Sequence, residues 1–221
     1  MKKKFLWVST IVSLVVFVIF SILTSKNGDL AFDKAIMSWI DRISSPGLEN
    51  AMDMITIVGK SEVILFLTLL IAALLFFMKK DWLNSLFIIF ITGSGVVLNY
   101  VLKILFHRER PDDEINYIEA FGHSFKMISY SFPSGHTMRI SLIVAFLIYL
   151  CIIYLRHKWS KALWITLLSF ILIVVGFSRV VLGEHFPSDV VAAISASFAW
   201  FSICLLVLSS IHWKRFRKRQ G

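Results

Sequence analysis

Six long apolar runs, separated by short polar segments, dominate the pattern of this 221-residue chain. They cover roughly residues 5–23, 61–78, 82–105, 133–155, 162–182 and 188–211. An α-helix needs about 20 apolar residues to cross the hydrocarbon core of a bilayer, and each run reaches or approaches that length. The pattern therefore predicts an all-α protein, a six-transmembrane helix bundle that forms a single domain over residues 1–221.

A different pattern occupies the segment between the first two runs. Charged residues alternate there with apolar residues at helical spacing, namely Phe32, Ile36, Trp39, Ile40 and Ile43. This pattern predicts a short amphipathic helix on the outer membrane surface, ended by the turn residues Ser45-Pro46-Gly47. A connector that packs on the bundle is the alternative interpretation.

Composition narrows the class of protein. Apolar residues make up 57% of the chain and the mean hydropathy is +0.78, which excludes an ordinary soluble domain. A formal net charge of +9 would suit a nucleic-acid-binding protein, but the basic residues cluster between the apolar runs. Because that distribution is typical of membrane proteins, we expect membrane lipids and no nucleic acid as partners. Cys151 and Cys204 fall inside apolar runs, which favours buried thiols over a disulfide or metal site.

The positions of lysine and arginine predict the orientation in the membrane. With the N-terminus in the cytoplasm, the cytoplasmic flanks contain one acidic residue, Asp81, and more than half of the 23 basic residues. Those basic residues are Lys2, Lys3, Lys4, Lys79, Lys80, Arg156, Lys158, Lys161, Lys214, Arg215, Arg217, Lys218 and Arg219. Cytoplasmic loops of membrane proteins are enriched in Lys and Arg, so we predict that both termini are cytoplasmic. The first run is followed by no small-residue cleavage site, and we interpret it as a retained span, not a signal peptide.

The third run ends in two cations seven residues apart, Lys103 and Arg110. Seven residues are about two helical turns, so the two side chains would share a face if the helix continued to Arg110. Pro111 disfavours a longer helix. Two cations facing one point suit a multiply charged anion. Ordinary basic flanking of a span is the alternative, but basic residues are not favoured on the outer side.

The fourth run opens with Pro133-Ser134-Gly135-His136. A helix start presents backbone N–H groups and the positive end of the helix dipole, which together bind phosphate. Ser134 adds a hydroxyl group, and Gly135 permits close approach of an oxyanion. His136 is placed to donate a proton to a leaving oxygen.

The segment between the fifth and sixth runs combines Arg179, His185 and Asp189. Charged residues at the end of a membrane span are costly and often functional. His185 and Asp189 are four residues apart, so the carboxylate can hold one imidazole nitrogen and raise the basicity of the other, as a histidine nucleophile requires. Arg179 offers a fork of donors for phosphate oxygens. The structural alternative is a capped helix start, with Pro187 in its first turn, beside a membrane-edge arginine.

In the predicted topology, the three stretches lie at the outer ends of spans three to six, so one bundle brings them to one level of the membrane. They resemble, in order and spacing, the three-part motif of the type 2 phosphatidic acid phosphatase family: Lys103-x6-Arg110-Pro111, Pro133-Ser134-Gly135-His136 and Ser178-Arg179-x5-His185-x3-Asp189. All the defining positions match. The resemblance implies a six-span enzyme of a bacterial plasma membrane that hydrolyses a lipid phosphate or diphosphate without a metal or cofactor.

The same resemblance implies a role for each motif residue. His185 attacks phosphorus to form a phosphohistidine, Asp189 orients His185, and His136 protonates the leaving group and then helps to activate water. The oxygens of the transferred group are held by Lys103, Arg110, Arg179, Ser134 and the amide of Gly135. Undecaprenyl pyrophosphate and phosphatidylglycerophosphate are the favoured substrates. The alternatives are a lipid phosphotransferase with the same intermediate and a non-catalytic phospholipid carrier; a carrier would not need the His185–Asp189 pair.

Other polar residues lie near these motifs. Asp112-Asp113-Glu114 is a candidate magnesium site, although acidic runs in loops are usually solvated. Arg139 lies three residues after His136, where it either contacts a second phosphate or extends toward the membrane interface. We interpret the remaining histidines as structural or solvated: His107, His123, His157 and His212.

Overall fold

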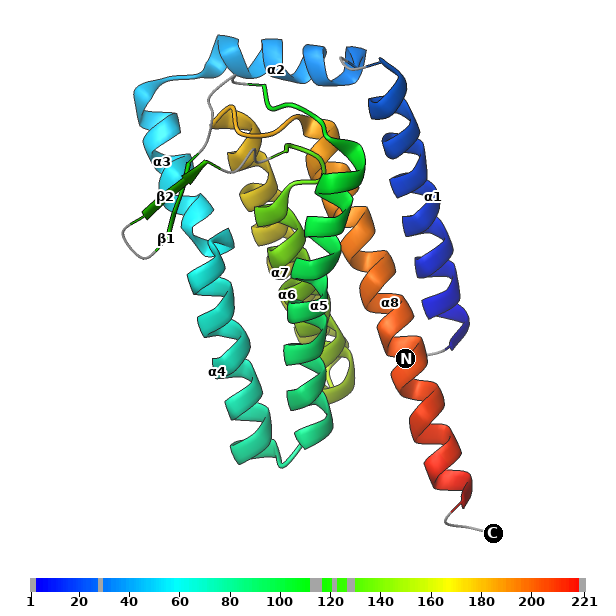
Figure 1. Cartoon of the computed structure of the whole chain (residues 1–221). Coiled ribbons are helices and arrows are strands. Elements are labelled where there is room, and N and C mark those ends of the chain that lie inside the picture. The colour runs from blue at the N-terminus through cyan, green and yellow to red at the C-terminus, as the bar shows by residue number, and fades with distance from the viewer. Residues whose placement is uncertain (1–2, 28–29, 112–116, 121–122, 127–129, 219–221) are drawn as a thin grey trace.

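The computed structural model describes residues 3–27, 30–111, 117–120, 123–126 and 130–218. Within these ranges six helices are long and apolar enough to cross a membrane. They are α1 (Lys3–Asn27), α4 (Ser61–Lys79), α5 (Trp82–Phe106), α6 (Gly135–Tyr154), α7 (Lys158–Val181) and α8 (Pro187–Lys218). Figure 1 shows them running alongside one another as a bundle, which confirms the predicted fold class.

The predicted amphipathic helix is present as α2 (Ala31–Ile43). Figure 1 shows it lying across one end of the bundle, away from the first turn of α1 and the last turns of α8. Ile40 packs on Val180 and Val181 at the end of α7, whereas Phe32 and Trp39 stay exposed. One part of the apolar face of α2 therefore packs on the bundle, and another part faces outward.

The turn residues after α2 begin a further helix that the apolar pattern does not predict. This helix, α3 (Pro46–Thr56), has Pro46 in its first turn, where the missing N–H is not needed. Ser45 caps it, because its Oγ accepts a hydrogen bond from the N–H of Leu48 at 3.3 Å. A 3-10 turn, η1 (Ile57–Gly59), then joins α3 to α4.

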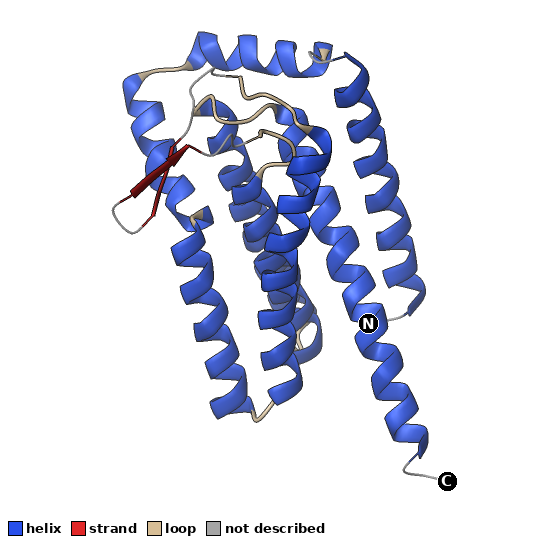
Figure 2. Ribbon diagram, viewed as in Figure 1, coloured by secondary structure: helices blue, strands red, loops and turns tan. Residues whose placement is uncertain are grey.

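A short antiparallel hairpin, also absent from the prediction, follows α5 and precedes α6 in the chain. Figure 2 shows its two strands in red. Its strands are β1 (Tyr117–Ala120) and β2 (His123–Lys126), with Tyr117 opposite Lys126.

The core of the bundle surrounds α6. Phe146 of α6 is fully buried, together with Ile88 and Ile91 of α5. Gly95 of α5 faces Leu142 of α6 so closely that a Cβ atom at residue 95 would lie 2.1 Å from Leu142 Cδ1. Small residues let membrane helices approach each other in this way. The close packing fixes the end of α5 relative to the start of α6, where two of the three motifs lie.

Candidate active site

The three motifs meet at the end of the bundle that α2 crosses. Lys103 lies in the last turn of α5 and Arg179 in the last turn of α7. His136 lies in the first turn of α6 and Asp189 in the first turn of α8. Because α5 and α7 run toward this end while α6 and α8 start from it, residues distant in sequence reach one level of the bundle (Figure 1).

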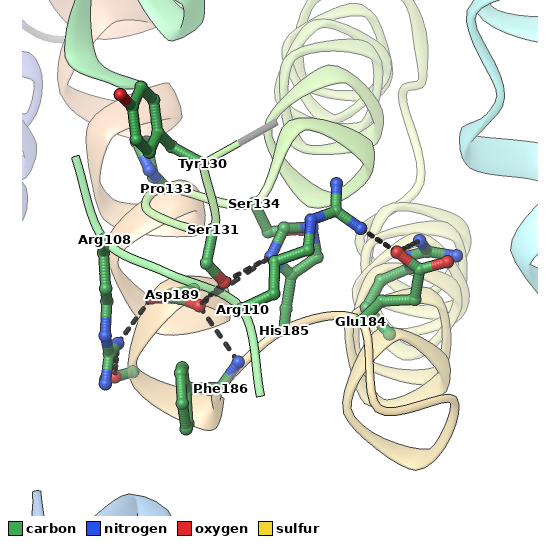
Figure 3. A network of polar contacts seen from close by, with 12 residues as sticks. Arg108, Arg110, Tyr130, Ser131, Pro133, Ser134, Glu184, His185, Phe186 and Asp189 are labelled. Atoms are coloured by element: carbon green, nitrogen blue, oxygen red, sulfur yellow. Dashed lines mark hydrogen bonds and ion pairs between the residues drawn. The ribbon is translucent and has the colours of Figure 1, made fainter. Parts of the chain in front are cut away.

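His185 contacts Asp189 through a third residue. Its Nδ1 atom lies 3.1 Å from Ser131 Oγ, and the Ser131 hydroxyl donates to Asp189 Oδ2. The direct distance from Nδ1 to Asp189 Oδ2 is 3.7 Å, which is too long for a hydrogen bond. Since Ser131 donates its only proton to Asp189, it accepts the proton of Nδ1, and the lone pair of the imidazole is left at Nε2. Figure 3 shows this chain of contacts.

The start of α8 holds Asp189 in place. The helix begins at Pro187, in the predicted first-turn position, and Asp189 Oδ2 accepts the N–H of Phe186 at 3.0 Å. The carbonyl oxygen of Asp189 accepts the N–H of Ser134 at 3.3 Å. This backbone contact joins the third motif directly to the second.

Ser134 and Gly135 shape the start of α6. Ser134 is fully buried and caps the helix, with its Oγ 3.0 Å from Thr137 Oγ1. A Cβ atom at Gly135 would lie 3.2 Å from Asn99 Oδ1 and 3.9 Å from Lys103 Cε. Glycine at residue 135 therefore lets two polar side chains of α5 approach the start of α6.

His136 lies between Arg139 and Gly59. The Nη2 atom of Arg139 is 3.4 Å from Nδ1 of His136. A guanidinium group can only donate, so Nδ1 accepts this contact and the ring proton is left on Nε2. Arg139 also donates to the carbonyl oxygen of Gly59 at 3.4 Å, so its side chain lies against both His136 and η1.

Three cations, Lys103, Arg110 and Arg179, form what we call the cationic cup. Lys103 donates to the carbonyl oxygen of Tyr130, close enough to His185 for their charges to interact. Arg110 forms an ion pair with Glu184 (Figure 3), and Arg179 Nη2 lies 3.2 Å from Glu184 Oε2. A single carboxylate therefore bridges the two arginines.

Lys103 and Arg110 do not share one helix face, because the condition for it, a helix that continues to Arg110, is not met. Helix α5 ends at Phe106, and His107 adopts a left-handed conformation with φ of 47°. The N–H of His107 bonds to the carbonyl of Lys103 at 3.1 Å and closes the helix. Arg110 thus reaches the cup from the chain beyond the helix.

A family model of the PAP2 superfamily matches residues 82–213 of this chain. Phosphatidylglycerophosphatase B of Bacillus subtilis (strain 168) is 33% identical over 205 residues, which cover 92% of this chain and 95% of that protein. This chain belongs to the PAP2 superfamily. A lipid A 1-phosphatase of Rhizobium johnstonii is 30% identical over 136 residues, which cover 58% of this chain and 48% of that protein.

Solved structures agree with this membership. The PAP2-type phosphatidylglycerolphosphate phosphatase from Bacillus subtilis has a TM-score of 0.76 and 29% identity, over 93% of this chain and 96% of that one. Aquifex aeolicus LpxE shares the fold, with a TM-score of 0.58 and 23% identity over 80% of this chain and 96% of that one. This PAP2 protein is accordingly a multi-pass membrane protein and a lipid phosphate hydrolase.

Burial controls the protonation of His185 in this PAP2 site. It lowers the pKa of His185 from 6.5 to about 4, and Lys103 and Arg110 act in the same direction. The nearby Asp189 carboxylate acts in the opposite direction and raises the pKa of His185, without cancelling the effect of burial. The imidazole is therefore neutral at neutral pH, with its Nε2 lone pair unprotonated.

Sequence reasoning missed four polar residues of the PAP2 site: Ser131, Glu184, Arg108 and Asp33. Arg108 pairs with both Asp189 and Asp33, and all three side chains are buried. The spacing along α2 could have indicated Asp33, because it lies seven residues before Ile40 and so on the helix face that Ile40 buries. Arg108 gave no separate signal, because a basic residue just after a span is ordinary flanking.

The remaining predictions concern residues outside the motifs. The Asp112-Asp113-Glu114 run lies outside the described residues, as do the side chains of His123 and His212. His107 and His157 are exposed, and of the two free cysteines Cys204 is buried and Cys151 partly buried. Within the described part of the chain, no group of three or more His, Cys, Asp or Glu is arranged to hold a metal ion.

Proposed function

We propose that this hydrolase cleaves a lipid phosphate or diphosphate through a phosphohistidine on His185, at the outer face of the membrane. The observation that carries the proposal is the state of His185: it is buried and neutral, with Nδ1 bound to Ser131 and cations of the cup nearby. A neutral imidazole with a fixed tautomer is what nucleophilic attack on phosphorus requires.

In the first step, Nε2 of His185 attacks phosphorus and the bond to the leaving oxygen breaks. Lys103, Arg110 and Arg179 stabilise the charge on the equatorial oxygens, together with the amide of Gly135. His136 takes up a proton when the anionic substrate offsets the positive charge around it, and it delivers that proton to the leaving oxygen.

In the second step, His136 accepts a proton from water as the water attacks the phosphohistidine. The P–N bond breaks, inorganic phosphate leaves and His185 regains its lone pair. The imidazolium character that His185 has in the intermediate is stabilised through Ser131 by Asp189. Ser134 serves mainly as the cap that fixes the start of α6.

The substrates we favour are undecaprenyl pyrophosphate and phosphatidylglycerophosphate. The name of the Bacillus subtilis relative, phosphatidylglycerophosphatase B, supports the second. Both present a terminal phosphate that the cup can bind while the apolar tail stays in the membrane. A phospholipid carrier is disfavoured because binding alone needs cations and not a Ser131-linked imidazole.

The outer-face assignment is supported by charge. The flanks at the end of the bundle away from α2 contain more than half of the 23 basic residues and a single acidic residue, Asp81, whereas the candidate site lies at the α2 end (Figure 1). Cytoplasmic flanks are the basic ones in membrane proteins, so we assign the α2 end to the outside.

The direct test is phosphate release from a panel of undecaprenyl diphosphate, phosphatidylglycerophosphate and phosphatidate by the purified full chain. We expect turnover of at least one of them, and a loss of about four orders of magnitude in His185→Ala. An alkaline quench of the wild type during turnover should trap phosphate on His185, detectable by mass spectrometry. Folded protein without activity on the panel, or full activity of His185→Ala, would contradict the proposal.

A further inference from the structure

Buried charges of alternating sign lie behind Asp189, on the side away from His185. Arg108 Nη1 lies 2.6 Å from Asp189 Oδ1, and Arg108 Nη2 lies 2.8 Å from Asp33 Oδ2. Their exposed fractions are 9% for Arg108, 1% for Asp33 and 0% for Asp189. Charges interact strongly in such buried surroundings, so the arrangement of these three affects how well a positive charge on the imidazole of His185 is stabilised.

Arg108 is fixed by more than its two carboxylates. Its Nη1 also lies 2.7 Å from Ser188 Oγ, and its guanidinium carbon lies 4.0 Å from the centre of the Phe186 ring. Both partners flank the first residue of α8. The arginine therefore holds Asp189 at one oxygen while the other oxygen, Oδ2, faces Ser131 (Figure 3).

Asp33 connects this arginine to the surface helix α2. Its Oδ1 accepts the N–H of Ser188 at 2.8 Å and its Oδ2 accepts the Ser188 hydroxyl at 2.6 Å. A carboxylate that accepts an N–H at the first turn of a helix is a capping group. A residue of α2 thus caps α8, the helix that carries Asp189.

The pairing also has a consequence for charge. If Arg108 were bound to Asp189 alone, its positive charge would largely cancel the negative charge of that carboxylate. Arg108 is shared by two carboxylates, so the group of three carries a net negative charge next to His185. The charged or titratable groups around His185 also include Lys103 of α5, Arg110 beyond α5 and His136 of α6. The carboxylate of Glu184 lies in the same cup, where it is paired with Arg110 and Arg179.

We propose that Arg108 and Asp33 are positioning residues for the reaction: Arg108 fixes the Asp189 carboxylate, and Asp33 keeps Arg108 from neutralising it. The inference rests on the proposed role of His185 as nucleophile. The negative charge that Asp33 preserves then stabilises the positive charge that develops on His185 when the phosphohistidine forms.

The variant Asp33→Asn removes the charge while its remaining oxygen can still accept the N–H of Ser188 and cap α8. Its NH2 group replaces the oxygen that accepts from Arg108 and from the Ser188 hydroxyl, so the variant also loses that acceptor. We expect kcat to fall roughly tenfold, the loss typical for removal of a group that acts through another, with KM within about twofold. The acid limb of kcat/KM due to His185 should move to lower pH, because Arg108 would then offset Asp189 more completely. The matched control is Asp41→Asn, on the exposed side of α2, which should behave as the wild type.

A double-mutant cycle tests whether the two residues act together. Arg108→Met leaves two buried carboxylates without the cation between them, so we expect a larger loss than in Asp33→Asn. In the double variant Asp33→Asn/Arg108→Met, the loss of kcat should be smaller than the product of the two single losses. If Arg108→Met alone does not fold, the double variant compared with Asp33→Asn gives the effect of Arg108 without the Asp33 charge, and the kcat and pH profile of Asp33→Asn then decide the test.

Two results would overturn the inference. One is a kcat for Asp33→Asn within twofold of the wild type with an unchanged pH profile. The other is a cycle in which the single losses simply multiply. Either result with an inactive His185→Ala would reject the inference and leave the proposed nucleophile standing, whereas an active His185→Ala would reject the proposed function itself.

Discussion

At the scale of single residues, a buried position and one hydroxyl group set the state of His185. Burial keeps the imidazole neutral, and Ser131 fixes its tautomer by accepting the proton of Nδ1. Asp189 acts through that hydroxyl and is itself held by Arg108. The nucleophilic role that we propose for His185 therefore depends on contacts with Ser131 and Arg108 that the His-x3-Asp spacing does not reveal.

The lowered pKa of His185 predicts a pH dependence of stability. Between pH 6.5 and about 4 the unfolded chain binds a proton at His185 and the folded chain does not, so stability falls as pH falls through this window. His185→Gln removes this linkage. The melting temperature of the wild type should therefore drop more between pH 7 and pH 5 than that of His185→Gln. Equal drops in the two proteins would contradict the pKa shift.

Glu184 predicts an effect on anion binding. Its carboxylate bridges Arg110 and Arg179, the cations that we assign to phosphate oxygens, so an incoming phosphate competes with it. Glu184→Gln removes that negative charge, and inorganic phosphate should inhibit about two- to fivefold more tightly, as expected for a partly exposed ion pair. The inhibition constant of phosphate measures the effect, with the exposed Glu49→Gln as control. Weaker inhibition in Glu184→Gln would mean that Glu184 orders the arginines and does not compete.

At the scale of elements, the site is built from helix ends. Helix α5 delivers Lys103 in its last turn and then stops, which lets the following chain turn Arg108 inward and Arg110 to the cup. Helices α6 and α8 contribute their first turns, which carry His136 and Asp189. The turn η1 packs under His136 and positions it from a third direction.

The packing of η1 predicts an effect of a single methyl group. A Cβ atom at Gly59 would lie 3.1 Å from His136 Cδ2 and 3.2 Å from its Cβ, so Gly59→Ala should displace the imidazole by a few tenths of an ångström. We expect kcat to fall severalfold, since a misplacement on the order of 1 Å costs about a hundredfold. Gly47→Ala, where nothing lies within 4 Å, is the matched control. Normal kinetics of Gly59→Ala would show that His136 is not sensitive to its position.

At the scale of the whole molecule, the bundle separates a basic end from a catalytic end. The loop between α6 and α7 lies at one end, with the first turn of α1 and the last turns of α8, and α2 and the site lie at the other (Figure 1). Asp33 links the surface helix α2 to the bundle, because it belongs to α2 and caps α8. The surface helix is thus joined to the catalytic helix by buried polar contacts and not only by apolar packing.

This architecture predicts the side of the membrane on which each end lies. In a background with Cys151→Ser and Cys204→Ser, the exposed positions Ser38 of α2 and His157 before α7 can each be changed to cysteine. A membrane-impermeant maleimide should label the Ser38→Cys variant in intact cells, and the His157→Cys variant only after permeabilisation. The opposite labelling pattern would put the site on the cytoplasmic side.

The sequence by itself determined the six membrane-spanning helices and the candidate residues at their ends. In a bilayer, an apolar run of about 20 residues forms an α-helix, because the helix bonds every backbone polar group within the segment itself. The positions of Lys103, His136, Arg179, His185 and Asp189 at the ends of those runs were likewise readable from spacing.

Only the tertiary structure decided how those groups connect. Ser131 reaches His185 across 54 residues, Arg108 reaches Asp189 across 81, and Asp33 reaches Ser188 across 155. Helix α5 ends at Phe106 because His107 adopts a left-handed conformation and its N–H bonds to the carbonyl of Lys103, which an apolar pattern does not reveal. Sequence periodicity reports which face of an element is buried, whereas a hydrogen bond between elements depends on how helices pack and where each one stops.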